Sequence, residues 1–178
     1  MNIITGAIGA GKTTVLKELN RLGYKTINEP AREIIAEQRA INGEGVYDRE
    51  PRLFYELMLS RALFEYKQNH SVSDLVIFDR GIPDNIAYAK LFHIDSKAAE
   101  NAARLYRYNQ KVFFLPGWEK IYVTDEDRKM SFSEAKAFGQ RVRELYINLS
   151  YTVIDVPFSH PEERAQFISN EIKNKDHE

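Results

Sequence analysis

The chain has 178 residues, of which 43% are hydrophobic and 29% are charged, a composition typical of a water-soluble globular domain. Its 25 basic and 26 acidic side chains leave a net charge of −1, without the basic excess of non-specific nucleic-acid binders. The absence of cysteine excludes disulfides and thiol catalysis, and no apolar run reaches the ~20 residues of a membrane-spanning helix. We therefore expect a single cytoplasmic domain over residues 1–178, a monomer or homodimer that partners neither nucleic acid nor membranes.

Short apolar runs alternate along the chain with stretches of helical periodicity. The runs predict five strands at 2–5, 24–28, 75–78, 112–116 and 152–156. Helices are expected at 13–22, 31–40, 50–69, from 83, at 96–108, at 133–149 and from 161. The aromatic side chains of helix 50–69 are expected in the core. Because strands that alternate with helices form parallel sheets, the pattern predicts a three-layer α/β fold with helices on both faces.

The segment between the first strand and the first helix carries the strongest motif. Gly6-Ala7-Ile8-Gly9-Ala10-Gly11-Lys12-Thr13 matches G-x-x-x-x-G-K-[ST] at every specified position. Glycines let backbone N–H groups turn toward a phosphate, and the following helix adds its N-terminal partial charge. Lys12 is expected to reach the β- and γ-phosphates, Thr13 to ligate Mg²⁺ and Thr14 to bond near the α-phosphate. The predicted nucleotide-binding residues are Gly6, Gly9, Ala10, Gly11, Lys12, Thr13 and Thr14.

Asp79 and Arg80 follow the apolar run 75–78, where ligands of parallel sheets bind. In proteins with this phosphate loop, an aspartate at this place holds Mg²⁺ opposite the loop hydroxyl, so Thr13 and Asp79 are the predicted metal ligands. Arg80 is expected to contact phosphate, to stabilise Asp79 or to bind substrate. The alternative is a structural Asp79–Arg80 pair at a strand end.

Glu29 ends the second predicted strand, on the γ-phosphate side of the loop. A carboxylate there can accept the proton of an attacking hydroxyl, as a general base, or bind the substrate. Alternatively, Glu29 caps the helix that begins near Ala31. Arg32, in the first turn of that helix, is a candidate ligand of an anionic or hydroxylated acceptor or a surface residue.

The charged stretch after the fourth strand is predicted to form a lid over about 117–131. Arg128 is expected to bring positive charge to the γ-phosphate in the transition state. Trp118 and Tyr122 would either stack on a base or pack beneath the lid. The alternative for the whole stretch is a solvated loop.

Several motifs, in order along the chain, resemble those of small P-loop AAA-domain ATPases related to the ribosylnicotinamide-kinase domain of NadR-type proteins. They are Ile4-Thr5-Gly6, Asn28-Glu29-Pro30-Ala31-Arg32-Glu33-Ile34-Ile35, Phe78-Asp79-Arg80-Gly81-Ile82-Pro83-Asp84, Leu115-Pro116-Gly117-Trp118 and Ile121-Tyr122-Val123-Thr124-Asp125 with Arg128. The resemblance implies the fold of nucleoside and nucleotide kinases, with a five-stranded parallel sheet and a mobile lid, and it implies ATP and Mg²⁺. The Glu29-Pro30 pair also resembles that of deoxynucleoside kinases, whose glutamate is the base.

The leading hypothesis is a magnesium-dependent kinase that phosphorylates a small, nucleoside-like hydroxyl compound. The predicted catalytic residues are Lys12, Glu29, Asp79, Arg80 and Arg128, and the predicted substrate-binding residues are Glu29, Arg32 and Arg80. One alternative is an ATPase that transfers phosphate to water. The other is a nucleotide-sensing binding protein with little turnover. The chain is too short to include the helical lid domain of ring-forming mechanical ATPases, so the AAA label carries no mechanical meaning here.

Overall fold

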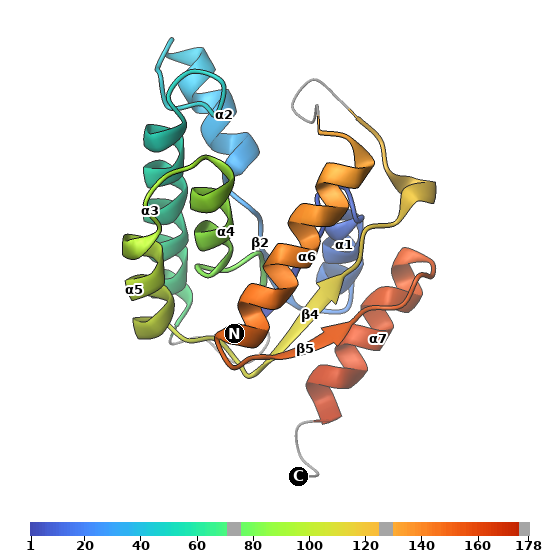
Figure 1. The fold of residues 1–178 in the computed structure, drawn as a ribbon. Coiled ribbons are helices and arrows are strands. Elements are labelled where there is room, and N and C mark those ends of the chain that lie inside the picture. Colours follow the sequence, from blue (N-terminus) through green and yellow to red (C-terminus); the bar gives the residue numbers. More distant parts are fainter. Residues whose placement is uncertain (71–75, 125–129, 175–178) are drawn as a thin grey trace.

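A computed structural model describes residues 1–70, 76–124 and 130–174, in which strands and helices alternate as expected (Figure 1). The elements are β1 (Asn2–Gly6), α1 (Lys12–Arg21), β2 (Lys25–Ile27), α2 (Ala31–Ala40), α3 (Pro51–Asn69), β3 (Val76–Asp79), α4 (Asp84–Leu91), α5 (Lys97–Leu105), β4 (Lys111–Leu115), the 3₁₀ turn η1 (Glu119–Ile121), α6 (Phe132–Asn148), β5 (Thr152–Asp155) and α7 (Pro161–Lys173).

The five strands form one parallel sheet in the order β2-β3-β1-β4-β5. The central strand β1 pairs Ile3 with Phe78 of β3 on one side and with Val112 of β4 on the other. Because all strands are parallel, their carboxyl ends meet at one edge of the sheet. The predicted sheet is confirmed, and its order adds one fact that the chain order did not supply: β3 lies between β1 and β2.

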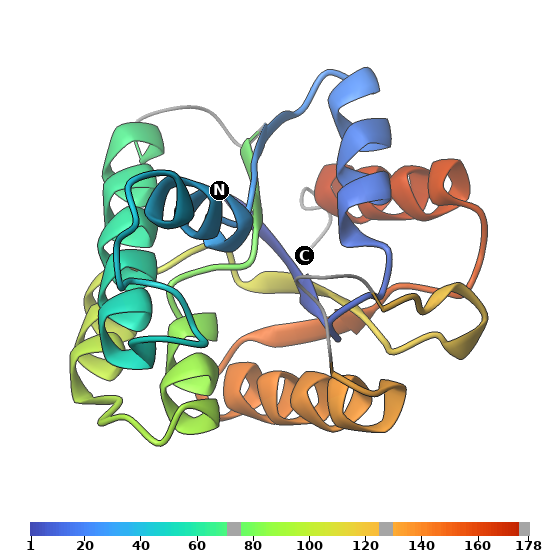
Figure 2. The ribbon, with the colours of Figure 1, turned by 90° about the horizontal axis from the view of Figure 1, so that it is seen from above.

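Helices cover both faces of the sheet, as Figure 2 shows with α1 and α7 on one side and α4 and α6 on the other. Successive residues of β1 enter different cores, because side chains alternate along a strand. Ile4 packs with α1 and α7, whereas Ile3 packs with residues of α3, α4, α5 and α6. The predicted three-layer P-loop fold is therefore confirmed. None of the described helices is both long and apolar enough to cross a membrane.

The long helix α3 departs from expectation at one aromatic residue. Phe54, Tyr55 and Tyr66 are buried as expected, but Phe64 is 55% exposed. The expectation is wrong for Phe64 because the helix has apolar residues on more than one side, and the side that contains Ser60 and Phe64 faces outward.

Candidate active site

A cavity of about 1380 Å³ opens at the carboxyl ends of β2 and β3. Its walls include most of the predicted site: Gly9, Ala10, Gly11, Lys12, Thr13, Thr14, Glu29, Arg32, Asp79 and Arg80. The predicted Arg128 lies outside the described residues. Residues from two strand ends, the loop after β1 and four helices thus meet in one cavity, at the edge where parallel sheets bind ligands.

The phosphate loop is held in shape by its neighbours. Gly9 and Gly11 adopt φ of 76° and 84°, a left-handed conformation that glycine adopts without a steric penalty. A Cβ at Gly6 would lie 2.1 Å from the Leu115 carbonyl oxygen of β4. On the other side, a Cβ at Gly139 of α6 would lie 2.8 Å from the Cβ of Ala7. Gly6 therefore lets β4 approach the loop, a role distinct from the predicted phosphate binding.

Lys12 is buried behind the loop, and within the described chain its Nζ donates only to the carbonyl oxygen of Ala7, at 3.5 Å. Burial, and then the Arg80 cation, lower the pKa of Lys12, while Asp79 and Glu29 oppose them. A buried cation is costly when no anion contacts it. The loop and Lys12 together therefore fit a polyphosphate, which would supply the missing anion.

Asp79 is the last residue of β3, and its side chain is buried. Its Oδ1 has no hydrogen-bond partner among the described residues, and burial, opposed by Lys12, raises its pKa to about 6. The described chain holds no group of three or more His, Asp or Glu residues placed for a metal ion. Mg²⁺ usually takes few protein oxygens beside substrate phosphates, so the unpaired Asp79 oxygen and the exposed Thr13 hydroxyl fit this ion.

Glu29 is held at the cavity by Arg80, which follows β3, and by Tyr88 of α4. Its Oε1 accepts a hydrogen bond from the Tyr88 hydroxyl at 2.5 Å and forms an ion pair with Arg80 Nε at 3.0 Å. Burial alone would raise the pKa of Glu29, but Arg80, Lys12 and the Tyr88 hydrogen bond together lower it. Burial raises the pKa of Tyr88, so its hydroxyl remains a donor. Glu29 is therefore ionised at neutral pH and contacts β3 and α4, not the backbone of α2.

The alternative of a structural Asp79–Arg80 pair is not found among the described residues, because the Arg80 guanidinium pairs with Glu29 and Asp84. Its Nη1 donates to Asp84 Oδ1 at 3.0 Å and to the Gly6 carbonyl oxygen at 3.1 Å. The residue adopts a left-handed φ of 65°, and its backbone N–H donates to the Ile4 carbonyl oxygen at 2.8 Å. Arg80 thus connects Glu29 with the end of β1, where the phosphate loop begins.

Asp84 holds Arg80 in this position and is the main residue that the sequence interpretation missed. Its buried carboxylate accepts hydrogen bonds from Thr5 Oγ1 at 2.6 Å, Tyr146 OH at 2.6 Å, Gly81 N at 2.9 Å and Arg80 Nη1 at 3.0 Å. Its position in the sequence could have indicated this role. Asp84 is the last residue of the motif Phe78-Asp79-Arg80-Gly81-Ile82-Pro83-Asp84, lies four residues after Arg80 and begins α4.

The part of the cavity beyond Glu29 has an aromatic wall. Tyr88 stacks on Phe92 with ring centroids 6.3 Å apart, and Phe92 meets Phe54 edge-on at 6.1 Å. Tyr47 extends this wall, and Arg32 lies exposed at the rim of the cavity. Apolar walls with a few charged groups at one end are typical of sites for small molecules that contain a ring.

The described part of the predicted lid lies against the phosphate loop. A Cβ at Gly11 would lie 3.1 Å from the Ile121 side chain. Trp118 packs on Phe158 with ring centroids 5.2 Å apart. Tyr122 meets Phe132 edge-on at 5.5 Å, and its hydroxyl donates to the Met130 carbonyl oxygen. Trp118 and Tyr122 therefore pack on protein side chains in this structure.

A parallel sheet with β1 at its centre, a glycine-rich phosphate loop between β1 and α1, and charged residues at the neighbouring strand ends define a P-loop nucleotide-binding fold. More particularly, the family model described as AAA domain matches residues 2–164, so the chain belongs to this family. No curated protein matches the sequence.

Several solved structures share the fold. Deoxyadenosine kinase from M. mycoides with bound dATP has a TM-score of 0.66 and 18% identity, over 98% of this chain and 100% of that one. Shikimate kinase from Acinetobacter baumannii, in complex with shikimate, has a TM-score of 0.61 and 18% identity, over 99% of this chain and 94% of that one. NadR protein in complex with NR has a TM-score of 0.66 and 19% identity, over 96% of this chain and 51% of that one. The expected relation to NadR-type and nucleoside-kinase-like folds is confirmed.

Proposed function

We propose that the protein is a magnesium-dependent kinase that transfers the γ-phosphoryl group of ATP to a hydroxyl of a small, nucleoside-like molecule. The fold supports a phosphotransferase or an ATPase in general. The arrangement of the cavity favours transfer to an organic acceptor over hydrolysis.

One observation carries this proposal: the same cavity joins the phosphate loop to an ionised carboxylate and an aromatic wall. Glu29 lies between the two regions, held by Tyr88 and Arg80. A protein that only hydrolyses ATP needs no apolar pocket beyond its base, whereas a ring-bearing acceptor does. The hydroxyl of such an acceptor would lie at Glu29, with its ring against Phe54 and Phe92.

The described residues supply the chemistry of phosphoryl transfer as follows. Glu29 accepts the proton of the acceptor hydroxyl as the new oxygen–phosphorus bond forms and the bond to the ADP oxygen breaks. Lys12 and Arg80 place positive charge beside the transferred group. Thr13 and Asp79 would hold Mg²⁺, which when bound offsets the charge of the phosphate oxygens. Positioning and electrostatics provide most of the acceleration in such reactions.

The proposed enzyme has two further parts, a lid and a contact to the acceptor at the rim of the cavity. Residues from about 117 to 131 would form a lid over the nucleotide, with Arg128 adding positive charge at the γ-phosphate. Arg32 would contact the acceptor at the rim. We further expect a cytoplasmic enzyme whose partner is its small-molecule acceptor.

The deciding experiment measures ADP release with a panel of nucleosides, ribosylated cofactors and other small hydroxyl compounds, in the presence of MgATP. At least one compound should stimulate ADP release and be recovered as its phosphate. Lys12→Ala should abolish this turnover while circular dichroism shows an intact fold. Steady ATP loss that no acceptor stimulates would identify a hydrolase, and ATP binding without turnover would identify a nucleotide sensor. Either result would overturn the proposal.

A further inference from the structure

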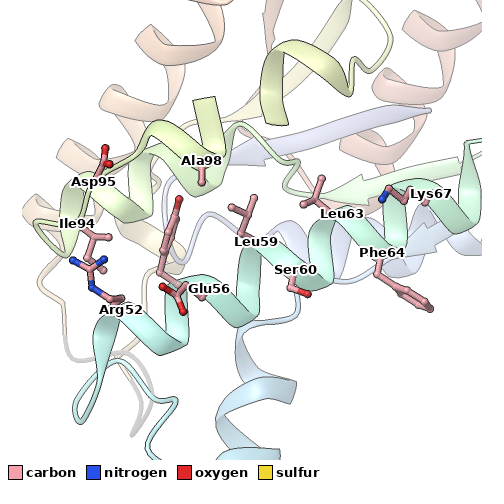
Figure 3. Close-up of a pocket in the computed structure, with 11 residues that line it drawn as sticks. Arg52, Glu56, Leu59, Ser60, Leu63, Phe64, Lys67, Ile94, Asp95 and Ala98 are labelled. Atoms are coloured by element: carbon pink, nitrogen blue, oxygen red, sulfur yellow. The ribbon is translucent and has the colours of Figure 1, made fainter. Parts of the chain in front are cut away.

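A second cavity, of about 590 Å³, lies away from the active site between α3 and the start of α5. We call it the α3–α5 groove, formed by Tyr55, Leu59, Leu63, Ile94 and Ala98. Figure 3 shows Leu59 and Leu63 turned toward α5, while the Phe64 ring projects out of α3. An apolar groove and an exposed aromatic ring thus occur on the same face of the molecule.

The two ends of the groove carry opposite charge. Figure 3 places Arg52, Glu56 and Asp95 at one end, which thus has two carboxylates and one guanidinium. Lys67 lies at the other end, with its Nζ 5.7 Å from the centre of the Tyr106 ring that follows α5. The groove therefore runs from a net negative end to a positive end.

We propose that this face binds a second copy of the same chain across a two-fold axis, with α3 antiparallel to its counterpart. A two-fold interface must be complementary to itself, because each copy contributes the same surface. Antiparallel packing meets this condition: it places Lys67 of each copy against Glu56 and Asp95 of the other. The Phe64 ring of each copy then covers the α3–α5 groove of its partner.

The composition of the face fits this occupant better than a nucleic acid or a charged ligand. Phe64 is 55% exposed, and aromatic residues at the centre of a patch with charges at its rim are typical of protein–protein interfaces. Ser60, between Glu56 and Phe64 on the outward side of α3, is small enough for two helices to approach closely. The site does not overlap the nucleotide cavity, so dimerisation and catalysis can be tested separately.

Sedimentation velocity of the purified protein from roughly 1 to 100 µM tests the proposal. The wild type should form a species of twice the 20.7 kDa of one chain. Phe64→Glu should raise the dimer dissociation constant at least about 30-fold. The matched control is Ile147→Glu, on α6 and 47% exposed, which should leave the dimer unchanged. Circular dichroism and ATP binding establish that each variant is folded.

A charge-reversal pair tests the orientation independently. Lys67→Glu alone should weaken the dimer, and the double variant with Glu56→Lys should restore it, because opposite charges then meet again. A wild type that stays monomeric at 100 µM, a dimer that Phe64→Glu leaves intact, an assembly larger than a dimer, or a double variant without recovery would each overturn the proposal. None of these outcomes depends on whether the protein is a kinase.

Discussion

Arg80 Nε lies 3.0 Å from Oε1 of Glu29, so that an ion pair connects the carboxyl ends of the adjacent strands β3 and β2. The same guanidinium contacts the end of β1 through the Gly6 carbonyl oxygen. Arg80 therefore links the candidate base, which Tyr88 also holds, to the start of the phosphate loop. Loss of the base and loss of its positioning should have different kinetic effects.

Replacing Glu29 by glutamine should lower kcat by about 100-fold or more, because the amide cannot accept the acceptor proton. ATP affinity should stay the same or increase, since a negative charge near Lys12 disappears. Coupled ADP-release kinetics and calorimetry with ATP measure the two effects. Glu33→Gln, an exposed carboxylate at the same cavity, is the control. Equal turnover in wild type and Glu29→Gln would remove the base assignment.

Replacing Tyr88 by phenylalanine should change the pH profile. The Tyr88 hydrogen bond helps to lower the pKa of Glu29, so its loss raises that pKa toward the ordinary value. The base works only when ionised, and activity falls as pH drops through its pKa. The acid limb of kcat/KM should therefore move to higher pH, with Tyr47→Phe on the same wall as control. An unmoved acid limb would contradict the role of Tyr88.

The metal assignment predicts that Asp79→Asn raises the Mg²⁺ concentration for half-maximal activity by about 10- to 100-fold. The free energy of unfolding without nucleotide should not fall, because burial disfavours the charged form of Asp79 and its Oδ1 has no hydrogen-bond partner among the described residues. Magnesium titrations of activity test the first effect, and urea unfolding without nucleotide tests the second. Asp95→Asn, between α4 and α5 and outside the nucleotide cavity, controls for the loss of a carboxylate. A normal magnesium requirement would show that Asp79 is not a ligand.

Asp84→Asn should destabilise the fold by about 3–5 kcal/mol, because it breaks a buried ion pair with Arg80 and alters a carboxylate that accepts four hydrogen bonds. The control is Asp155→Asn, which removes a largely exposed pair with Arg143 and should cost less than about 1 kcal/mol. Urea unfolding of both variants gives the comparison. Similar losses would show that the Asp84 cluster contributes little to stability.

Gly6→Ala should cost more than about 3 kcal/mol, because its Cβ would lie 2.1 Å from the Leu115 carbonyl oxygen. Gly23→Ala provides the comparison: its φ is 95°, but no atom lies within 4 Å of the added Cβ. Only backbone strain of about 1–2 kcal/mol remains there. Thermal unfolding should separate the two variants clearly. If both lose the same stability, close packing at Gly6 is not what fixes the loop.

The sequence was sufficient to predict the sheet and the edge of the sheet at which most of the predicted site residues meet. Glu29 and Asp79 follow apolar runs, and parallel strands bring such positions to one edge. Tyr88 could not be predicted in this way, because its contact with Glu29 depends on β3 lying beside β2. Chain order does not contain that adjacency. The partner of Arg80 was left open between phosphate, Asp79 and substrate, and Asp84 was not among these candidates. The left-handed backbone at Arg80 turns the guanidinium toward Asp84.

Phe64 illustrates a different limit. A hydrophobic residue in a helix indicates a side chain that gains from burial. A single sequence does not say whether the core of the same chain or another molecule buries it. The apolar residues of α3 lie on several sides of the helix, so periodicity could not identify the outward one.

The start of the phosphate loop is packed between β4 and α6: Ala7 N donates to the Leu115 carbonyl oxygen at 3.1 Å, and a Cβ at Gly139 would lie 2.8 Å from the Cβ of Ala7. Its ordering entropy is thus lost when the polypeptide folds, before any nucleotide arrives. A triphosphate would meet a loop whose first residues are already ordered, which lowers the entropy cost of binding at this end of the cavity.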